Sequence, residues 1–173
     1  MQKAVRIIGI DPGYAIVGYG VLDYCANRFS VVRYGAVTTP AAMPFERRLE
    51  RIYDELAVIL QEDKPQAMAV EKLFFTTNQK TAIDVAQARG IVQLCAVKHG
   101  VHIAEYTPLQ VKMAVVGYGK ADKNQVMQMT KTMLNLREVP KPDDTADALA
   151  VAICHAHTGV SGMNAENLRR LMR

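Results

Sequence analysis

Apolar and polar positions along the first third of the chain follow the pattern of β-strands. Residues 5–10 form a nearly continuous apolar run, which is typical of a strand buried on both faces. A turn is expected at Pro12 and Gly13. Residues 16–24 and 29–37 are rich in Val, Tyr and Gly, and residues 26–28 suit a hairpin connection between them. The pattern predicts three antiparallel strands in sequence order.

The period of the apolar positions then changes to that of helices. Residues 45–59 carry Phe, Leu and Ile at helical spacing, with Pro44 suited to the first turn and Pro65 just beyond the end. Residues 79–98 form a second helical stripe. Gly90 is unfavourable inside that helix unless another helix approaches closely, within the chain or between two chains.

The remainder alternates short strands and helices. Residues 67–73 and 101–106 are predicted to be strands, Asp122 suits the cap of another helix, and residues 143–157 form the last one. The predicted order is β-β-β-α-β-α-β-α-α. It describes an α/β fold, a mixed five-stranded sheet flanked by helices.

Length and composition restrict the class of protein. A chain of 173 residues fits one domain, expected over residues 1–158, with a flexible basic tail over 159–173. No apolar run reaches the roughly 18 residues that span a bilayer, and the N-terminus lacks the pattern of a signal peptide. The three cysteines are predicted to be reduced, and no Cys/His spacing resembles a zinc site. We therefore expect a cytoplasmic protein without membrane attachment. The net charge of +4 modestly favours a polyanionic partner.

Acidic residues inside apolar stretches are the strongest functional signal. Asp11 ends the most hydrophobic strand, although an Asp-Pro-Gly turn alone would also explain it. Glu71 interrupts an apolar run, where an unpaired buried carboxylate costs several kcal/mol; an exposed strand end is the alternative. Asp144 and Asp147 share one helix face by their i, i+3 spacing, whereas Asp143 is explained as a helix cap.

Carboxylates that a fold brings together repel one another unless a cation lies between them. An all-oxygen ligand set selects Mg²⁺, with Mn²⁺ as a substitute, over zinc. Two such ions stabilise the attacking and leaving oxygens of an in-line phosphoryl displacement. If Asp11, Glu71, Asp144 and Asp147 meet, the chemistry they indicate is phosphodiester hydrolysis.

Basic and aromatic residues lie near these acids in the sequence. Lys112 and Lys123 flank a glycine-containing loop and suit phosphate contacts, although solvated surface lysines are common. Phe74 lies where a strand gives way to a polar loop, so its ring could stack on an unpaired base or pack in the core.

Five motifs together resemble those of the RuvC family of Holliday junction resolvases. They are Ile8-Gly-Ile-Asp-Pro-Gly13, Val70-Glu-Lys-Leu-Phe74, Gln87-Ala-Arg-Gly90, Val111-Lys112 with Val116-Gly-Tyr-Gly119, and Asp144-Thr-Ala-Asp-Ala-Leu-Ala150. The resemblance covers about residues 5–157. It implies a ribonuclease H-like nuclease domain and a homodimer that resolves four-way junctions in recombination and repair, by paired Mg²⁺-dependent nicks.

The same resemblance assigns roles to residues. Asp11, Glu71, Asp144 and Asp147 match the catalytic, metal-binding cluster, expected to hold two ions. Phe74 matches the aromatic residue near the crossing point of the junction, and Lys112 and Lys123 match basic positions near the scissile phosphate. A complex with the RuvA and RuvB branch-migration proteins is implied by the family only.

Three other functions fit part of the pattern. A sugar-kinase or actin-like ATPase also opens with a Gly-Ile-Asp-x-Gly turn, but needs a second such domain that this chain is too short to hold. A related nuclease acting on RNA–DNA hybrids or ribosomal RNA precursors shares the carboxylates. A junction-binding protein without catalysis is disfavoured by the presence of all four acids.

Overall fold

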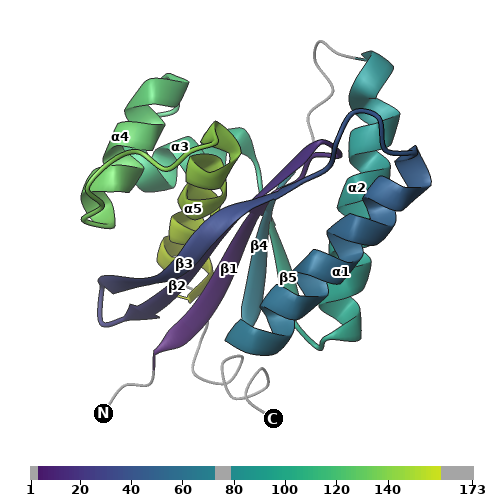
Figure 1. Ribbon diagram of the computed structural model, residues 1–173. Coiled ribbons are helices and arrows are strands. Elements are labelled where there is room, and N and C mark those ends of the chain that lie inside the picture. Colours follow the sequence, from purple (N-terminus) through teal and green to yellow (C-terminus); the bar gives the residue numbers. More distant parts are fainter. Residues whose placement is uncertain (1–3, 73–78, 161–173) are drawn as a thin grey trace.

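The computed structural model describes residues 4–72 and 79–160 as a single layered α/β unit, with one sheet between two groups of helices (Figure 1). The five strands are β1 (Val5–Asp11), β2 (Ile16–Cys25), β3 (Arg28–Thr38), β4 (Ala67–Glu71) and β5 (His102–Tyr106). The helices are α1 (Phe45–Asp63), α2 (Gln79–Lys98), α3 (Pro108–Val116), α4 (Lys123–Met133) and α5 (Asp143–His155), and a π-helical turn, η1 (Ala156–Val160), follows α5.

The sheet has the order β3-β2-β1-β4-β5. β1, β2 and β3 are antiparallel neighbours in sequence order, as predicted, while β4 and β5 add in parallel to β1. The mixed five-stranded sheet expected from the sequence is therefore confirmed. Because β1 and β4 are parallel, their carboxyl ends lie at the same edge of the sheet.

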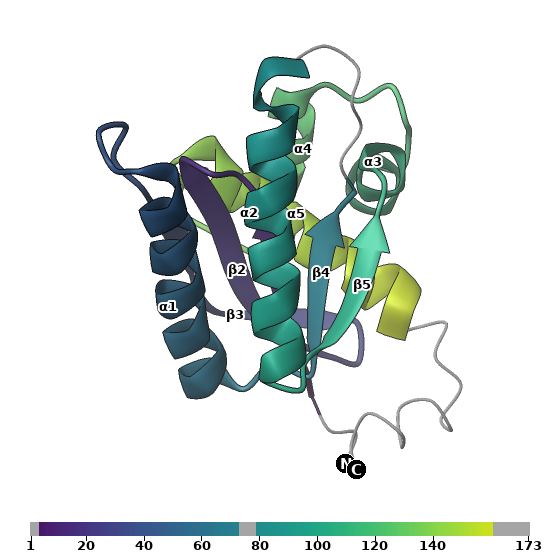
Figure 2. The ribbon, with the colours of Figure 1, turned by 90° about the vertical axis from the view of Figure 1, so that its right-hand side faces the viewer.

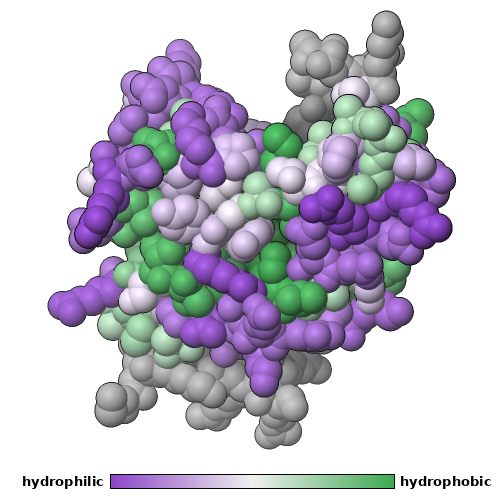
Figure 3. Space-filling view, viewed as in Figure 1, coloured by the Kyte–Doolittle hydropathy of each residue, from purple (hydrophilic) through white to green (hydrophobic). Residues whose placement is uncertain are grey.

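Alternate residues of β1 enter two separate cores. Ile7 faces α5, with α3 and α4 packed behind, and Ile8 and Ile10 face α1 and α2. Figure 2 shows α1 and α2 lying across the latter face. Figure 3 shows hydrophilic side chains over both helical layers, with a band of more apolar residues between them. Among the described helices, none is long and apolar enough to cross a membrane.

Helix α5 lies unusually close to the sheet because glycines replace side chains beneath it. An added Cβ at Gly9 would lie 2.0 Å from the carbonyl oxygen of Ala148, and one at Gly18 would lie 2.0 Å from that of Asp144. Neither distance is possible for a real Cβ, so any side chain at these positions would push α5 away. The small residues of α5 itself, such as Ala148 and Ala152, complete this close packing.

Several local predictions are confirmed and others are wrong. Asp122 caps α4 through a capping box with Gln125, and Cys25, Cys95 and Cys154 form no disulfide bonds. Helix α3 was not predicted, although Thr107-Pro108-Leu109-Gln110 is a capping-box sequence with proline in the first turn. The last α-helix ends at His155, whereas the sequence predicted that it would end at residue 157.

No other helix of the described chain packs closely against Gly90. Nothing lies within 4 Å of a Cβ built there, and the residue is exposed on α2. Of the two explanations that the sequence left open, a contact inside one chain is therefore wrong for the residues that the structure describes.

Candidate active site

Two acidic residues leave the sheet side by side. Asp11 is the last residue of β1 and Glu71 the last of β4, and the preceding residues, Ile10 and Val70, are paired in register. Because side chains alternate along a strand, Asp11 follows Gly9 onto the face that α5 covers. The two carboxylates thus begin next to each other, beside the start of α5.

Helix α5 adds two more acids at this edge. The backbone of Asp144 rests on Gly18, which pairs with Asp11 across β1 and β2. Asp147 lies one turn further along the same helix face. All four acids predicted from the sequence therefore converge, although they are separated by up to 136 positions (from 11 to 147).

The electrostatics of Asp11 reflect this convergence. Burial, together with the negative charges of Asp147, Glu71 and Asp144, raises the pKa of Asp11 from 3.8 to about 7, and the positive charge of Lys123 opposes this rise. Burial also raises the pKa of Glu71, with a further contribution from Asp147. A group of carboxylates that resist ionisation together is a site prepared for positive charge.

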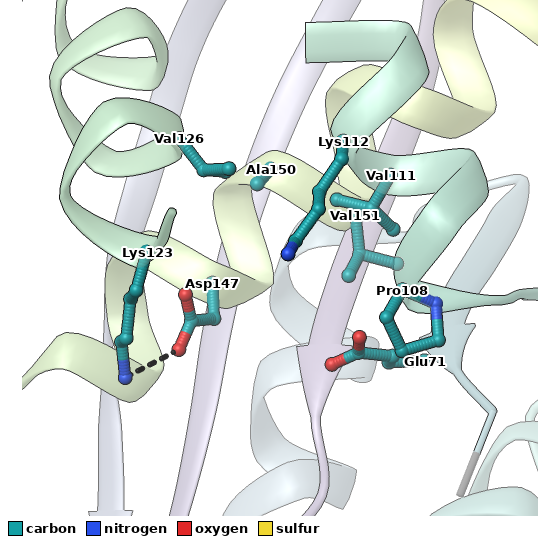
Figure 4. Close-up of a pocket in the computed structure, with 9 residues that line it drawn as sticks. All are labelled: Glu71, Pro108, Val111, Lys112, Lys123, Val126, Asp147, Ala150 and Val151. Carbon is teal, nitrogen blue, oxygen red and sulfur yellow. Dashed lines mark ion pairs between the residues drawn. The ribbon is translucent and has the colours of Figure 1, made fainter. Parts of the chain in front are cut away.

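Two lysines reach the same place from α3 and α4. Lys123 Nζ lies 3.0 Å from Asp147 Oδ2, and the positive charge of Lys112 partly opposes the rise in the pKa of Glu71 that burial causes. Figure 4 shows Lys112 pointing into the space between Asp147 and Glu71, and Lys123 paired with Asp147. Both predicted lysines therefore adjoin the acids.

These side chains line an open pocket of about 190 Å³. One wall of the pocket carries charged side chains of both signs, from Glu71, Asp147 and the two lysines. The other wall is apolar. The apolar lining comprises Pro108, Val111, Val126, Ala150 and Val151. Pro108 and Val111 belong to α3, so this wall was missed together with that helix; the capping box at Thr107 was the signal that could have found it.

Asp143 does not cap α5, contrary to the sequence-based interpretation. The N-cap position is Pro142, without a side-chain cap, and Asp143 is the first helical residue. Its carboxylate instead forms ion pairs with Lys141 at 2.7 Å and with Lys123 at 3.7 Å. These lysines lower the pKa of Asp143, with Lys141 contributing most.

Phe74, the remaining predicted site residue, lies outside the described residues. The described residues after β4 end at Lys72. Its backbone N–H donates a hydrogen bond to the carbonyl oxygen of Tyr106. This bond holds Lys72 beside the end of β5.

The ligand chemistry of the site fits a hard divalent cation. Its donors are carboxylate oxygens, which Mg²⁺ and Mn²⁺ prefer, and the described residues that line the pocket include no sulfur or imidazole ligand. As the side chains stand, however, no three of the described His, Cys, Asp and Glu residues are grouped closely enough to hold a metal ion. In this arrangement one of the four carboxylates, that of Asp147, is ion-paired with Lys123 (Figure 4).

Comparison with known proteins identifies the family. A family model described as Crossover junction endodeoxyribonuclease RuvC matches residues 7–155. The RuvC protein of Alkaliphilus oremlandii is 61% identical over 153 residues, which are 88% of this chain and 93% of that relative. RuvC of T. thermophilus, solved in complex with a Holliday junction substrate, superposes with a TM-score of 0.86 at 36% identity, over 91% of this chain and 96% of that one.

A more distant structure shares the architecture alone. The yeast mitochondrial Holliday junction resolvase Ydc2 matches with a TM-score of 0.68 at 14% identity, covering 98% of this chain and 85% of its own. The ribonuclease H-like fold expected from the sequence is thereby confirmed. Taken with the family model and the high identity to the curated relative, these matches show that the chain belongs to the RuvC family of crossover junction endodeoxyribonucleases.

Proposed function

We propose that this chain resolves Holliday junctions in recombination and repair, using Asp11, Glu71, Asp144 and Asp147 as its catalytic residues. The observation that carries the proposal is the meeting of these four acids beside two lysines at one edge of the sheet. The 36% identical T. thermophilus protein, solved with a Holliday junction, supports the choice of substrate.

The proposed cofactor is Mg²⁺, replaceable by Mn²⁺, with two ions in each active site. Asp11 and Glu71 would hold metal from the sheet, and Asp144 and Asp147 from α5. Bound Mg²⁺ supplies an activated water and stabilises the leaving 3′ oxygen. The raised pKa of Asp11 supports this assignment, since a nearby divalent charge would favour the ionised carboxylate.

We assign DNA contacts to three residues. Lys112 and Lys123 adjoin the acids and suit the phosphate on either side of the scissile bond. Phe74 follows Glu71 by three residues, and we propose that its ring stacks on bases at the crossing point of the junction.

The assay that tests this function is cleavage of a synthetic four-way junction, with a linear duplex and an RNA–DNA hybrid as controls. We expect paired nicks in the junction that require Mg²⁺ or Mn²⁺ and stop in chelator. Asp11→Asn and Glu71→Gln should abolish cutting while junction binding persists, because the lysines remain. Equal cutting of the hybrid, or near-normal cutting by either variant, would contradict the proposal.

We further propose a homodimer that pairs through α2. An exposed apolar stripe runs along this helix, with Ile83, Leu94 and Val97 exposed by 68%, 50% and 66%. Ala86 and Gly90 lie on the same stripe and are also exposed, so a second helix can approach closely there. A two-fold dimer would present equal sites to opposed strands of a junction.

Light scattering tests the dimer. Leu94→Glu should give a monomer at concentrations where the unaltered protein is a dimer, because a charge would be buried in the stripe. Val32→Glu on β3 is the matched control, since Val32 is another exposed apolar residue, at 37%. A dimeric Leu94→Glu protein would place the interface elsewhere. A complex with the RuvA and RuvB branch-migration proteins belongs to the same proposal, and co-sedimentation on a junction would test it.

A further inference from the structure

Charges of alternating sign form a chain from the surface to the acidic site. Lys141 Nζ lies 2.7 Å from Asp143 Oδ1, Asp143 Oδ2 lies 3.7 Å from Lys123 Nζ, and Lys123 Nζ lies 3.0 Å from Asp147 Oδ2. Lys141 at its outer end is the most exposed of the four side chains, at 72%, and Asp147 at its inner end is the least exposed, at 24%. Lys123 thus lies between one outer and one inner carboxylate.

The inner contact of Lys123 opposes metal binding. Asp147 Oδ2 faces Lys123 rather than Glu71 in this arrangement (Figure 4). An ammonium group and a divalent cation cannot both be close neighbours of one carboxylate oxygen without strong repulsion. The apparent dissociation constant for the cation is therefore the intrinsic constant divided by the fraction of molecules in which Lys123 does not engage Asp147.

The outer contact gives Lys123 a second resting place. The carboxylate of Asp143 already lies on the other side of the Lys123 ammonium group. The exposed side chain of Lys141 forms an ion pair with the same carboxylate. A small rotation of the flexible lysine chain would shorten the longer contact to Asp143 and break the one to Asp147. Lys123 would remain beside the pocket, with its charge directed at a phosphate.

We propose that Lys123 is a built-in competitor of the divalent cation at Asp147, and that Asp143 is the positioning residue that takes up Lys123 when Asp147 turns to bind metal. This inference rests on the proposed metal-dependent function. It gives Asp143 a role in the reaction cycle: it links cation binding at Asp147 to release of Lys123 toward the DNA.

Mn²⁺ binding to the DNA-free protein tests the idea, measured by the electron paramagnetic resonance signal of free Mn²⁺. Lys123→Met should bind Mn²⁺ roughly three- to tenfold more tightly, because the competitor is gone. Lys120→Met is the matched control: Lys120 is exposed in the loop before α4, and its loss removes the same charge from the surface. Asp143→Asn should bind Mn²⁺ more weakly, since Lys123 then rests on Asp147 alone.

The double variant separates positioning from simple charge. If Asp143 acts through Lys123, the loss of affinity caused by Asp143→Asn should be much smaller in the Lys123→Met protein. Equal losses in both backgrounds, or equal gains in Lys120→Met and Lys123→Met, would overturn the inference while leaving the metal site intact. An unaltered protein that binds no Mn²⁺ would contradict the metal site, and with it both proposals.

Discussion

Replacing Gly18 with alanine should separate the catalytic acids without touching any of them. Gly18 lies in β2 opposite Asp11, and the first turn of α5 rests on it. A Cβ at this position would lie 2.0 Å from the carbonyl oxygen of Asp144 and 2.9 Å from the amide nitrogen of Thr145. Both atoms belong to the backbone, so rotation of a side chain cannot relieve the clash.

The size of the effect follows from these distances. Real Cβ contacts essentially never fall below 3.0 Å, so the start of α5 must move from the sheet by about 1 Å. Overpacking of this kind costs about 1–3 kcal/mol of folding free energy. A displacement of about 1 Å at a catalytic group can lower the rate about 10²-fold.

Junction cleavage and thermal unfolding should be measured side by side. The matched control is Gly20→Ala in the same strand, because its Cβ would first meet the side-chain atoms Cδ2 and Cγ of Leu149, at 2.4 and 2.7 Å. That side chain can shift, so the control protein should be less stable than the unaltered protein. Its cleavage rate should fall by less than roughly tenfold. If Gly18→Ala cut junctions as fast as Gly20→Ala, close packing of α5 would not be what positions Asp144 and Asp147.

Two further predictions concern charge. In chelator, the stability of the unaltered protein should fall as the pH rises from about 4 to 7, because the fold raises the pKa of Asp11 from 3.8 to about 7 and so favours its protonated form. Asp11→Asn should reduce this dependence, leaving the part due to the raised pKa values of Glu71 and Asp147. The variant should be the more stable protein at pH 8, by at most about 4 kcal/mol in chemical denaturation. An unchanged pH profile would contradict the burial of the Asp11 carboxylate among the other acids. Lys112→Ala should weaken junction binding and reduce its salt slope by about one, whereas Lys98→Ala on α2 should not; an unchanged slope would place Lys112 away from phosphate.

Much of the fold could be predicted because its signals are local. The continuous apolar run before Asp11 predicted a strand buried on both faces, and the segments rich in Val, Tyr and Gly that follow predicted the next two strands. Glu71 stood out for the same reason, as a carboxylate next to an apolar strand. Helix α3 was missed because its nine residues are too few to show a clear period, although the cap at Thr107 marks its start.

The geometry of the site depends on contacts that a linear pattern does not record. Gly9 and Gly18 could be seen in the sequence, but their function appears only where α5 crosses them. Asp143 was interpreted as a cap because acids commonly occupy that position. The structure assigns the position to Pro142 and gives Asp143 two lysine partners, one of them 20 residues earlier in the chain.

The central claim is that Asp11, Glu71 and the start of α5 meet around a divalent cation. Anomalous diffraction from crystals grown with Mn²⁺ tests it most directly. We predict an anomalous peak bounded by the carboxylates of Asp11, Glu71 and Asp147, with Lys123 turned toward Asp143. Ordered Mn²⁺ bound elsewhere, with the Asp11 carboxylate taking no part in its coordination, would contradict the account.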